Sequence, residues 1–150
     1  MFKIAKLTDY AMLIVGQMAK ESSSVLSAPV LAETLHLSLP TVSKILKILL
    51  DKQLLSSVRG AEGGYRLNRP AKNIMVGEVI KAMEGEFAMT ECCESMPLCA
   101  IESMCQMREN WLKINKMIGH FLSQISIVEM LKPLPLSANW CEKAGEMYAE

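Results

Sequence analysis

The sequence predicts a mainly α-helical protein that carries one small β-hairpin. Apolar residues recur three or four positions apart in several stretches, which is the spacing of one helix face. A glycine-rich segment at 59–64 separates two short runs that are typical of strands. Of the 150 residues, 51% are hydrophobic and 21% are charged. This composition is that of an ordinary globular protein, and the length allows one compact domain with an appendage.

Three helices are predicted in the first third of the chain. The first follows Thr8, a candidate N-cap. Ser27 is placed to cap a second helix at 28–35, and a third is expected at 39–52. Pro40 suits the first turn of that third helix, because the N–H that proline lacks would be unpaired there. Two helices joined by so short a turn are typical of a helix-turn-helix. The first helix is predicted from four residues at helical spacing, Tyr10, Leu13, Ile14 and Met18.

Two strands are predicted at 54–58 and 65–67. The glycines between them permit the positive φ angles of a tight hairpin. A hairpin that directly follows a helix-turn-helix forms the wing of a winged helix-turn-helix domain. A further short helix is expected at 76–83.

The charge of the chain is divided between its two halves. The formal net charge is zero, yet residues 1–81 contain 11 Lys and Arg against 6 Asp and Glu. Residues 82–150 contain 5 against 10. A basic half joined to an acidic half fits a nucleic-acid face attached to a sensing or pairing module.

The third helix is the candidate reader of DNA. Hydroxyls and amines near its start can meet base edges and phosphates in the major groove, although a solvated helix face is the alternative interpretation. Arg59 lies beside Gly60 at the wing tip, where a cation either enters the minor groove or is a plain surface charge. The candidate DNA-binding residues are Ser38, Thr41, Ser43, Lys44, Lys47 and Arg59.

A long helix begins at about Met107 and is expected to pair two copies of the chain. Reading a palindrome with one domain per half-site requires a dimer; packing of the stripe onto its own domain is the alternative. A capping box at 126–129 predicts a short helix after it. The expected dimerisation stripe is Trp111, Ile114, Ile118, Phe121 and Ile125. The expected division is a DNA-binding domain, a cysteine-bearing loop, the dimerisation helix with the short helix, and a tail, at 1–84, 85–106, 107–132 and 133–150.

The loop carries three evenly spaced cysteines, Cys93, Cys99 and Cys105. Iron–sulfur clusters are held chiefly by Cys thiolates, so three of them require a fourth ligand from elsewhere. Zinc is less favoured, because its usual Cys-x2–4-Cys pairs are absent. A metal-free thiol switch and inert buried cysteines are the remaining interpretations. Cys92 can substitute for its neighbour, and the isolated Cys141 fits an inert role.

Other classes of protein are disfavoured. No stretch is apolar over the length of a membrane span, and the N-terminal residues lack the apolar core of a secretory signal, so a cytoplasmic protein is expected. No Cys-x-x-Cys pair, phosphate-binding loop or supported acid–base pair is present, so an enzyme is not expected.

Together these elements resemble the iron–sulfur-linked winged-helix regulators that include the IscR and NsrR transcription factors. The resemblance covers about residues 1–132 and implies a homodimer that binds palindromic promoter DNA. It also implies a [2Fe–2S] or [4Fe–4S] cluster between the long helix and the DNA-binding unit. The matching segments are 7–11, 57–60 with 63–65, 76–80, the cysteines and 125–131. The residues that look most like the regulator of the SUF cluster-assembly operon are 6–11, the Cys92-Cys93 pair, and Arg108 before Trp111 with Ile114-Asn115.

The resemblance also indicates a fourth ligand. IscR-like members have a His three residues after the last Cys, where this chain has Arg108. NsrR-like members use an Asp of the partner subunit near the N-terminus, and Asp9 stands at the matching place. Asp9 is therefore expected to complete the set; without the resemblance, it is an acid that stabilises a helix N-terminus.

The expected function is a transcriptional repressor of iron–sulfur cluster assembly genes that responds to cluster occupancy. The alternatives are a repressor that responds to nitric oxide or oxidants and a zinc-containing regulator.

Overall fold

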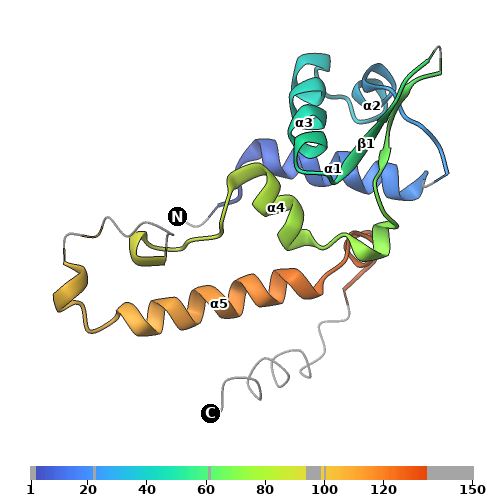
Figure 1. The fold of residues 1–150 in the computed structure, drawn as a ribbon. Coiled ribbons are helices and arrows are strands. Elements are labelled where there is room, and N and C mark those ends of the chain that lie inside the picture. Colours follow the sequence, from blue (N-terminus) through green and yellow to red (C-terminus); the bar gives the residue numbers. More distant parts are fainter. Residues whose placement is uncertain (1–2, 22, 61, 94–98, 100, 135–150) are drawn as a thin grey trace.

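The computed structural model describes residues 3–21, 23–60, 62–93, 99 and 101–134. It has the predicted class: helices with one two-stranded antiparallel sheet (Figure 1). Two further single-turn helices lie in the cysteine segment, at Glu91–Cys93 and Glu102–Met104. The elements in order are α1 (Lys6–Lys20), α2 (Ala28–Thr34), α3 (Leu39–Asp51), β1 (Leu55–Val58), β2 (Gly64–Leu67), η1 (Ala71–Asn73), α4 (Val76–Glu84), α5 (Arg108–Gln124) and α6 (Ile127–Met130).

Helix α1 begins earlier than predicted. Ala5 occupies the N-cap position, and Thr8 lies inside the first turn, buried, with no hydrogen-bond partner for its Oγ1. Leu13, expected on the apolar face, is exposed. The face that enters the core is formed by residues at i, i+3, i+4 and i+7, namely Ala11, Ile14, Val15 and Met18.

The helix-turn-helix is formed by α2 and α3. Ser27 accepts a hydrogen bond from the backbone N–H of Val30 and caps α2, as predicted. Ser38 caps α3 in the same way by accepting from the N–H of Thr41. The inner face of α3 is fully buried and consists of Val42, Ile45, Leu46 and Leu49.

The wing consists of β1 and β2, in a register from Leu55 opposite Leu67 to Val58 opposite Gly64. Leu26 pairs with Tyr65 through two backbone hydrogen bonds of 2.9 and 2.8 Å, so the wing is fastened to the entry of α2. A glycine is required in this pairing: a Cβ at Gly64 would stand 2.6 Å from the Leu26 carbonyl oxygen.

A short backbone ladder joins the end of α5 to the start of α4. The N–H of Val76 donates to the Ile125 carbonyl at 2.8 Å, and the N–H of Ile127 donates to the Ile74 carbonyl at 2.9 Å. Ile125 is only 4% exposed and packs with Val76 and Ile80. Dimerisation through Ile125 therefore does not fit the structure: this residue attaches α5 to its own domain.

The predicted capping box is present at the start of α6. The backbone N–H and the hydroxyl of Ser126 each donate to Glu129 Oε2 at 2.7 Å, and the N–H of Glu129 bonds to Ser126 Oγ. These bonds, chiefly the one from the Ser126 hydroxyl, hold the pKa of Glu129 below its ordinary value of 4.5.

This capping box predicts an acid-sensitive contribution to stability. Because the carboxylate pKa is lower in the folded than in the unfolded chain, the contribution is present above the ordinary pKa and is lost as the pH falls through the lowered one. Urea unfolding between about pH 6 and about pH 3 should therefore show a smaller acid-induced loss for Glu129→Gln than for the wild type. Ser126→Ala should lie between the wild type and Glu129→Gln, because it removes the hydroxyl bond and keeps the backbone bond to Glu129, and parallel curves for all three proteins would contradict the assignment.

Candidate DNA-binding face and thiol segment

The outward side of α3 carries the predicted DNA-binding residues. Ser43, Lys44 and Lys47 are all exposed, opposite the buried inner face. The helix packs against β1, and the hairpin extends from the same end of the molecule (Figure 1). Arg59 is exposed at the start of the hairpin turn, where Gly60 has a φ of 124°. The outward side of α3 and the hairpin turn therefore present three exposed cations, Lys44, Lys47 and Arg59.

Ser38 and Thr41, two of the predicted DNA-binding residues, are bonded to each other at the start of α3. Their hydroxyl oxygens lie 2.7 Å apart, and Ser38 Oγ also accepts from the Thr41 N–H at 3.4 Å. Both residues thus shape the first turn of α3, at the end where recognition helices meet base edges. Leu39, which the sequence marked only as the start of the helix, lies between them and is exposed.

Residues 85–106, here called the thiol segment, carry four cysteines, Cys92, Cys93, Cys99 and Cys105. All four are free and partly exposed. Thr90 Oγ1 lies 3.1 Å from the sulfur of Cys92 and 3.3 Å from that of Cys93. The Cys93 thiol also donates to the backbone carbonyl of Trp111 at 3.6 Å. Cys93, the first predicted ligand, therefore lies directly against the backbone of α5.

Asn115 of α5 holds the start of the thiol segment. Its Oδ1 accepts from the N–H of Met89 at 3.0 Å, and its Nδ2 donates to the Phe87 carbonyl at 2.9 Å. One side chain thus satisfies a donor and an acceptor of a segment with no regular structure, which an asparagine amide can do at both ends. Sequence analysis missed this role, because the partners are 26 and 28 residues away.

The ligand chemistry fits an iron–sulfur cluster, but the described residues do not gather the ligands. The thiols are the donors that such clusters take, and none of the four is engaged in a disulfide. Among the residues with described positions, no group of three His, Cys, Asp or Glu could hold a metal ion. Asp9 is exposed on α1. Residues 94–98 and 100, between the predicted ligands, and Cys141 lie outside the described residues.

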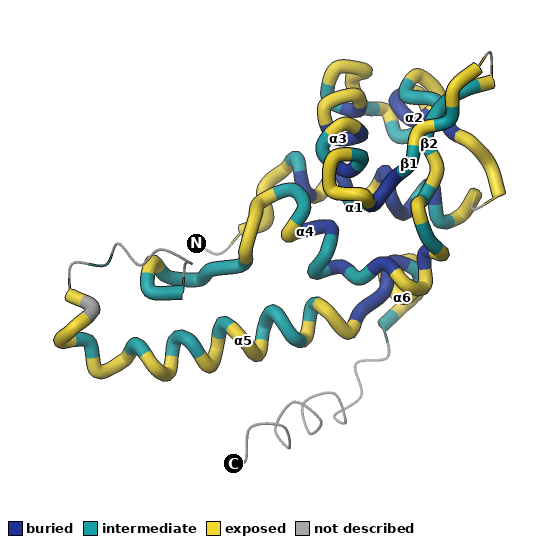
Figure 2. Tube along the Cα trace, in the orientation of Figure 1, coloured by how far each residue is buried: buried dark blue, intermediate teal, exposed yellow. Residues whose placement is uncertain are grey.

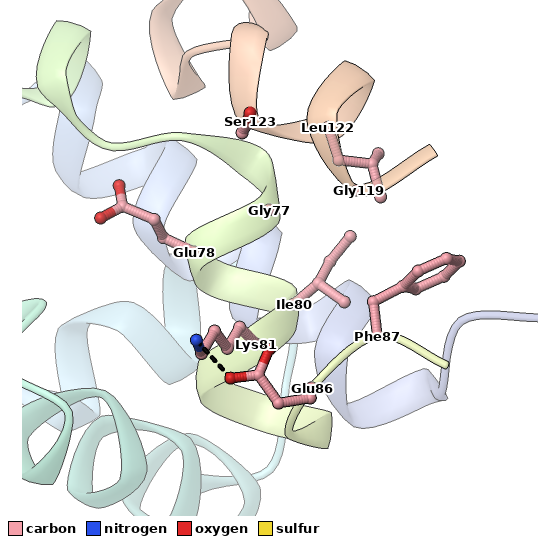
Figure 3. Close-up of a pocket in the computed structure, with 9 residues that line it drawn as sticks. All are labelled: Gly77, Glu78, Ile80, Lys81, Glu86, Phe87, Gly119, Leu122 and Ser123. Carbon is pink, nitrogen blue, oxygen red and sulfur yellow. Dashed lines mark ion pairs between the residues drawn. The ribbon is translucent and has the colours of Figure 1, made fainter. Parts of the chain in front are cut away.

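A cavity of about 230 Å³ lies between α4 and α5, where the thiol segment leaves α4 (Figure 3). Ile80, Phe87 and Leu122 give it an apolar lining, and an ion pair between Lys81 and Glu86 crosses one side. Beside it, Gly77 allows close approach of the helices, since a Cβ there would stand 3.3 Å from the Leu122 backbone. Gly77 and Leu122 thus both make the close approach between the helices and line the cavity.

A model of the Rrf2 family, described as an iron-dependent transcriptional regulator, matches residues 4–133. The chain belongs to the Rrf2 family.

Two individual relatives are similar to this chain over more than two thirds of its length. Protein aau3 of Rhizobium meliloti (strain 1021) is 30% identical over 134 residues, which cover 89% of this chain and 87% of that protein. The HTH-type transcriptional regulator NsrR of Bacillus subtilis (strain 168) is 30% identical over 108 residues, or 71% of this chain and 74% of that protein.

Two solved structures show the same architecture. CymR (YrzC), the global cysteine regulator of B. subtilis, superposes with a TM-score of 0.68 at 25% identity, over 87% of this chain and 96% of that chain. IscR of T. potens superposes with a TM-score of 0.67 at 25% identity, over 99% and 93%. This Rrf2 protein is therefore a DNA-binding transcriptional regulator and not an enzyme, as predicted. Since a cysteine regulator and an IscR share the fold, the fold alone does not define the signal.

Helix α5 of this Rrf2 protein carries exposed and partly exposed residues in alternation along its length. None of its 17 residues is buried (Figure 2). Trp111 and Ile118 are partly exposed, and Ile114 and Phe121 are 40% and 38% exposed. No helix in the described part of the chain is long and apolar enough to cross a bilayer.

Proposed function

We propose that this Rrf2 protein represses iron–sulfur cluster assembly genes and that the occupancy of a cluster sets its affinity for a palindromic operator. The observation that carries this proposal is the attachment of the thiol segment to α5. Cys93 bonds to the backbone of α5, and Asn115 of the same helix holds residues 87–89. A change in the thiol segment therefore acts directly on the helix that is proposed to pair the subunits.

The proposed ligands are the thiolates of Cys93, Cys99 and Cys105, with Asp9 of the partner subunit as the fourth. A bound cluster supplies a compact charged centre that favours the conformation in which these four side chains converge. Ligation shifts the population of a two-state protein when it favours one state. Among the described residues these side chains form no group that could hold a metal, so ligation would stabilise a conformation that brings them together.

The proposed route to DNA runs through the other end of α5. The ladder between Ile125–Ile127 and Ile74–Val76 fixes that end to the start of α4, which packs against α1 and α3 of the DNA-binding domain. A rotation of α5 against its partner helix would therefore change the separation of the two recognition helices. Half-site spacing is a geometric requirement of such dimers, so a change of this kind alters operator affinity.

The proposed dimer uses the α5 stripe of Trp111, Ile114, Ile118 and Phe121. An amphipathic helix with no buried residue in its own protomer requires a partner for its apolar side. A second copy supplies the same stripe under two-fold symmetry.

Removal of the three thiols is the direct test of cluster sensing. The Cys93→Ala, Cys99→Ala and Cys105→Ala triple variant should purify anaerobically without colour, iron or sulfide, and should leave its promoter released regardless of cluster supply. The thiols are partly exposed, so folding and the thermal midpoint should change little. Cys92→Ala is the matched control, because the Cys92 sulfur shares Thr90 with Cys93, whereas of the two thiols it is that of Cys93 which bonds to α5 in the described part of the chain.

Wild-type regulation by the triple variant would disprove cluster sensing. Loss of iron in Cys92→Ala with retention in Cys93→Ala would move the first ligand to Cys92. Release of DNA by metal-free wild type on exposure to nitric oxide or an oxidant would favour the thiol-based alternative.

A further inference from the structure

Leu39 is a large apolar side chain left exposed at the first turn of α3. It retains 46% of its surface, whereas Leu35 and Leu37, just before it, pack against the core. A single exposed leucine is ordinary on a protein surface. What distinguishes Leu39 is its place, because the N-terminal residues of a recognition helix are those that approach base edges.

The local structure of α3 does not need leucine at this position. With Ser38 as N-cap, a hydrophobic staple would pair the residue before the cap with the fourth residue of the helix. Those residues are Leu37 and Val42. Val42 is a buried member of the core cluster, and Leu37 packs against that cluster. Leu39 itself is not part of that cluster.

The surroundings of Leu39 favour duplex DNA as its partner. Leu39, Ser43 and Lys47 are four residues apart in turn, so they follow one another along one side of α3. Lys44 and Arg59 add positive charge to the same part of the molecule, which suits a phosphate-bearing partner and not an apolar protein surface.

The hydroxyls beside Leu39 are engaged with each other. Ser38 Oγ and Thr41 Oγ1 form a hydrogen bond with each other within the cap. The exposed Leu39 between them is therefore the apolar side chain that the first turn presents to a partner. The apolar group that the major groove offers is the 5-methyl of thymine, which proteins read by apolar contact.

We infer that Leu39 contacts the 5-methyl group of a thymine in each half-site and is a specificity-determining residue of the α3 reader. The inference rests on the proposed role of α3 in DNA binding and adds the base type that it reads. Burying one methyl-sized group contributes about 0.8 kcal/mol, which corresponds to about a fourfold change in affinity for each half-site.

The test combines a change in the protein with a change in the DNA. A duplex is first selected from random-sequence DNA with the wild-type protein. Each thymine pair related by the palindrome is then replaced by deoxyuridine, which lacks only the 5-methyl group. Dissociation constants are measured for the wild type, Leu39→Ala, Leu39→Met and Leu13→Ala. Leu13→Ala is the matched control, because Leu13 is equally exposed but lies on α1.

One thymine pair should stand out. Its replacement should weaken wild-type binding by about 16-fold over two half-sites and leave Leu39→Ala binding nearly unchanged. Leu39→Met should keep most of the sensitivity because it keeps an apolar side chain, and Leu13→Ala should keep all of it. A merely structural role of Leu39 would weaken binding to every duplex equally.

Two results would overturn the inference. If the duplex binds but Leu39→Ala retains the full wild-type response to every deoxyuridine, Leu39 reads no methyl, and the proposed DNA-binding role of α3 still stands. If charge reversal of Lys44 and Lys47 leaves binding intact, α3 is not the reader, and the inference fails together with the proposed face.

Discussion

The double substitution Lys44→Glu and Lys47→Glu is expected to reduce operator affinity on the order of 100-fold or more at about 0.15 M salt. Both side chains are exposed on α3, so neither contributes to the buried face and folding should be preserved. A dimer would present four of these lysines to the phosphates. The slope of log affinity against log salt is negative, and each lost phosphate contact reduces its magnitude by about one.

Fluorescence anisotropy of a labelled operator over a range of salt concentrations measures both quantities. In the variant the magnitude of the salt slope should decrease by up to about four. Lys113→Glu with Lys116→Glu is the matched control, because it makes the same change of charge on exposed positions of α5. An unchanged slope in the α3 variant, or an equal loss in the control, would show that α3 does not face the DNA.

The local elements of the fold could be predicted well from the sequence. The wing follows from its glycines, and the caps at Ser27 and Ser126 follow from serines placed before apolar helical runs. The start of α1 was predicted less well. Thr8 is a good capping residue by type, but its side chain is required inside the core, and Ala5 takes the cap position without a side-chain bond. Tertiary packing therefore overrode a local preference.

The end of α5 illustrates a second limit of sequence patterns. Ile125 continues the apolar period of the stripe, yet the helix ends at Gln124 and Ile125 adopts an extended conformation. Periodicity does not reveal where a chain turns to pair with a distant segment, here the stretch 74–76. The same limit applies to the thiol segment. The cysteines are visible in the sequence, but Thr90 and Asn115 gain their roles only through the folded structure.

The α5 stripe leads to the prediction with the largest expected effect on assembly. Ile114→Glu with Phe121→Glu should convert the protein to a monomer at micromolar concentration. Both side chains are exposed in the protomer, so the substitution adds no buried charge to the isolated fold. In a two-fold dimer it would place four carboxylates in the apolar contact, at a cost of several kcal/mol for each charge left without a partner. Dimer affinity should therefore fall by at least about 1,000-fold.

The effect on DNA binding distinguishes a loss of dimerisation from a loss of DNA contact by α3. A monomer retains α3 and the wing, so it should bind one half-site weakly and lose most of its affinity for the palindrome, because the second half-site no longer adds to the same binding event. Analytical ultracentrifugation measures the assembly, and anisotropy with whole and half operators measures the binding. The Lys113→Glu and Lys116→Glu protein again serves as the control, since it alters α5 off the apolar stripe. If the Ile114 and Phe121 variant sediments as a dimer, the subunits pair through another surface, and the thiol segment would then act on DNA by a route that does not pass through paired α5 helices.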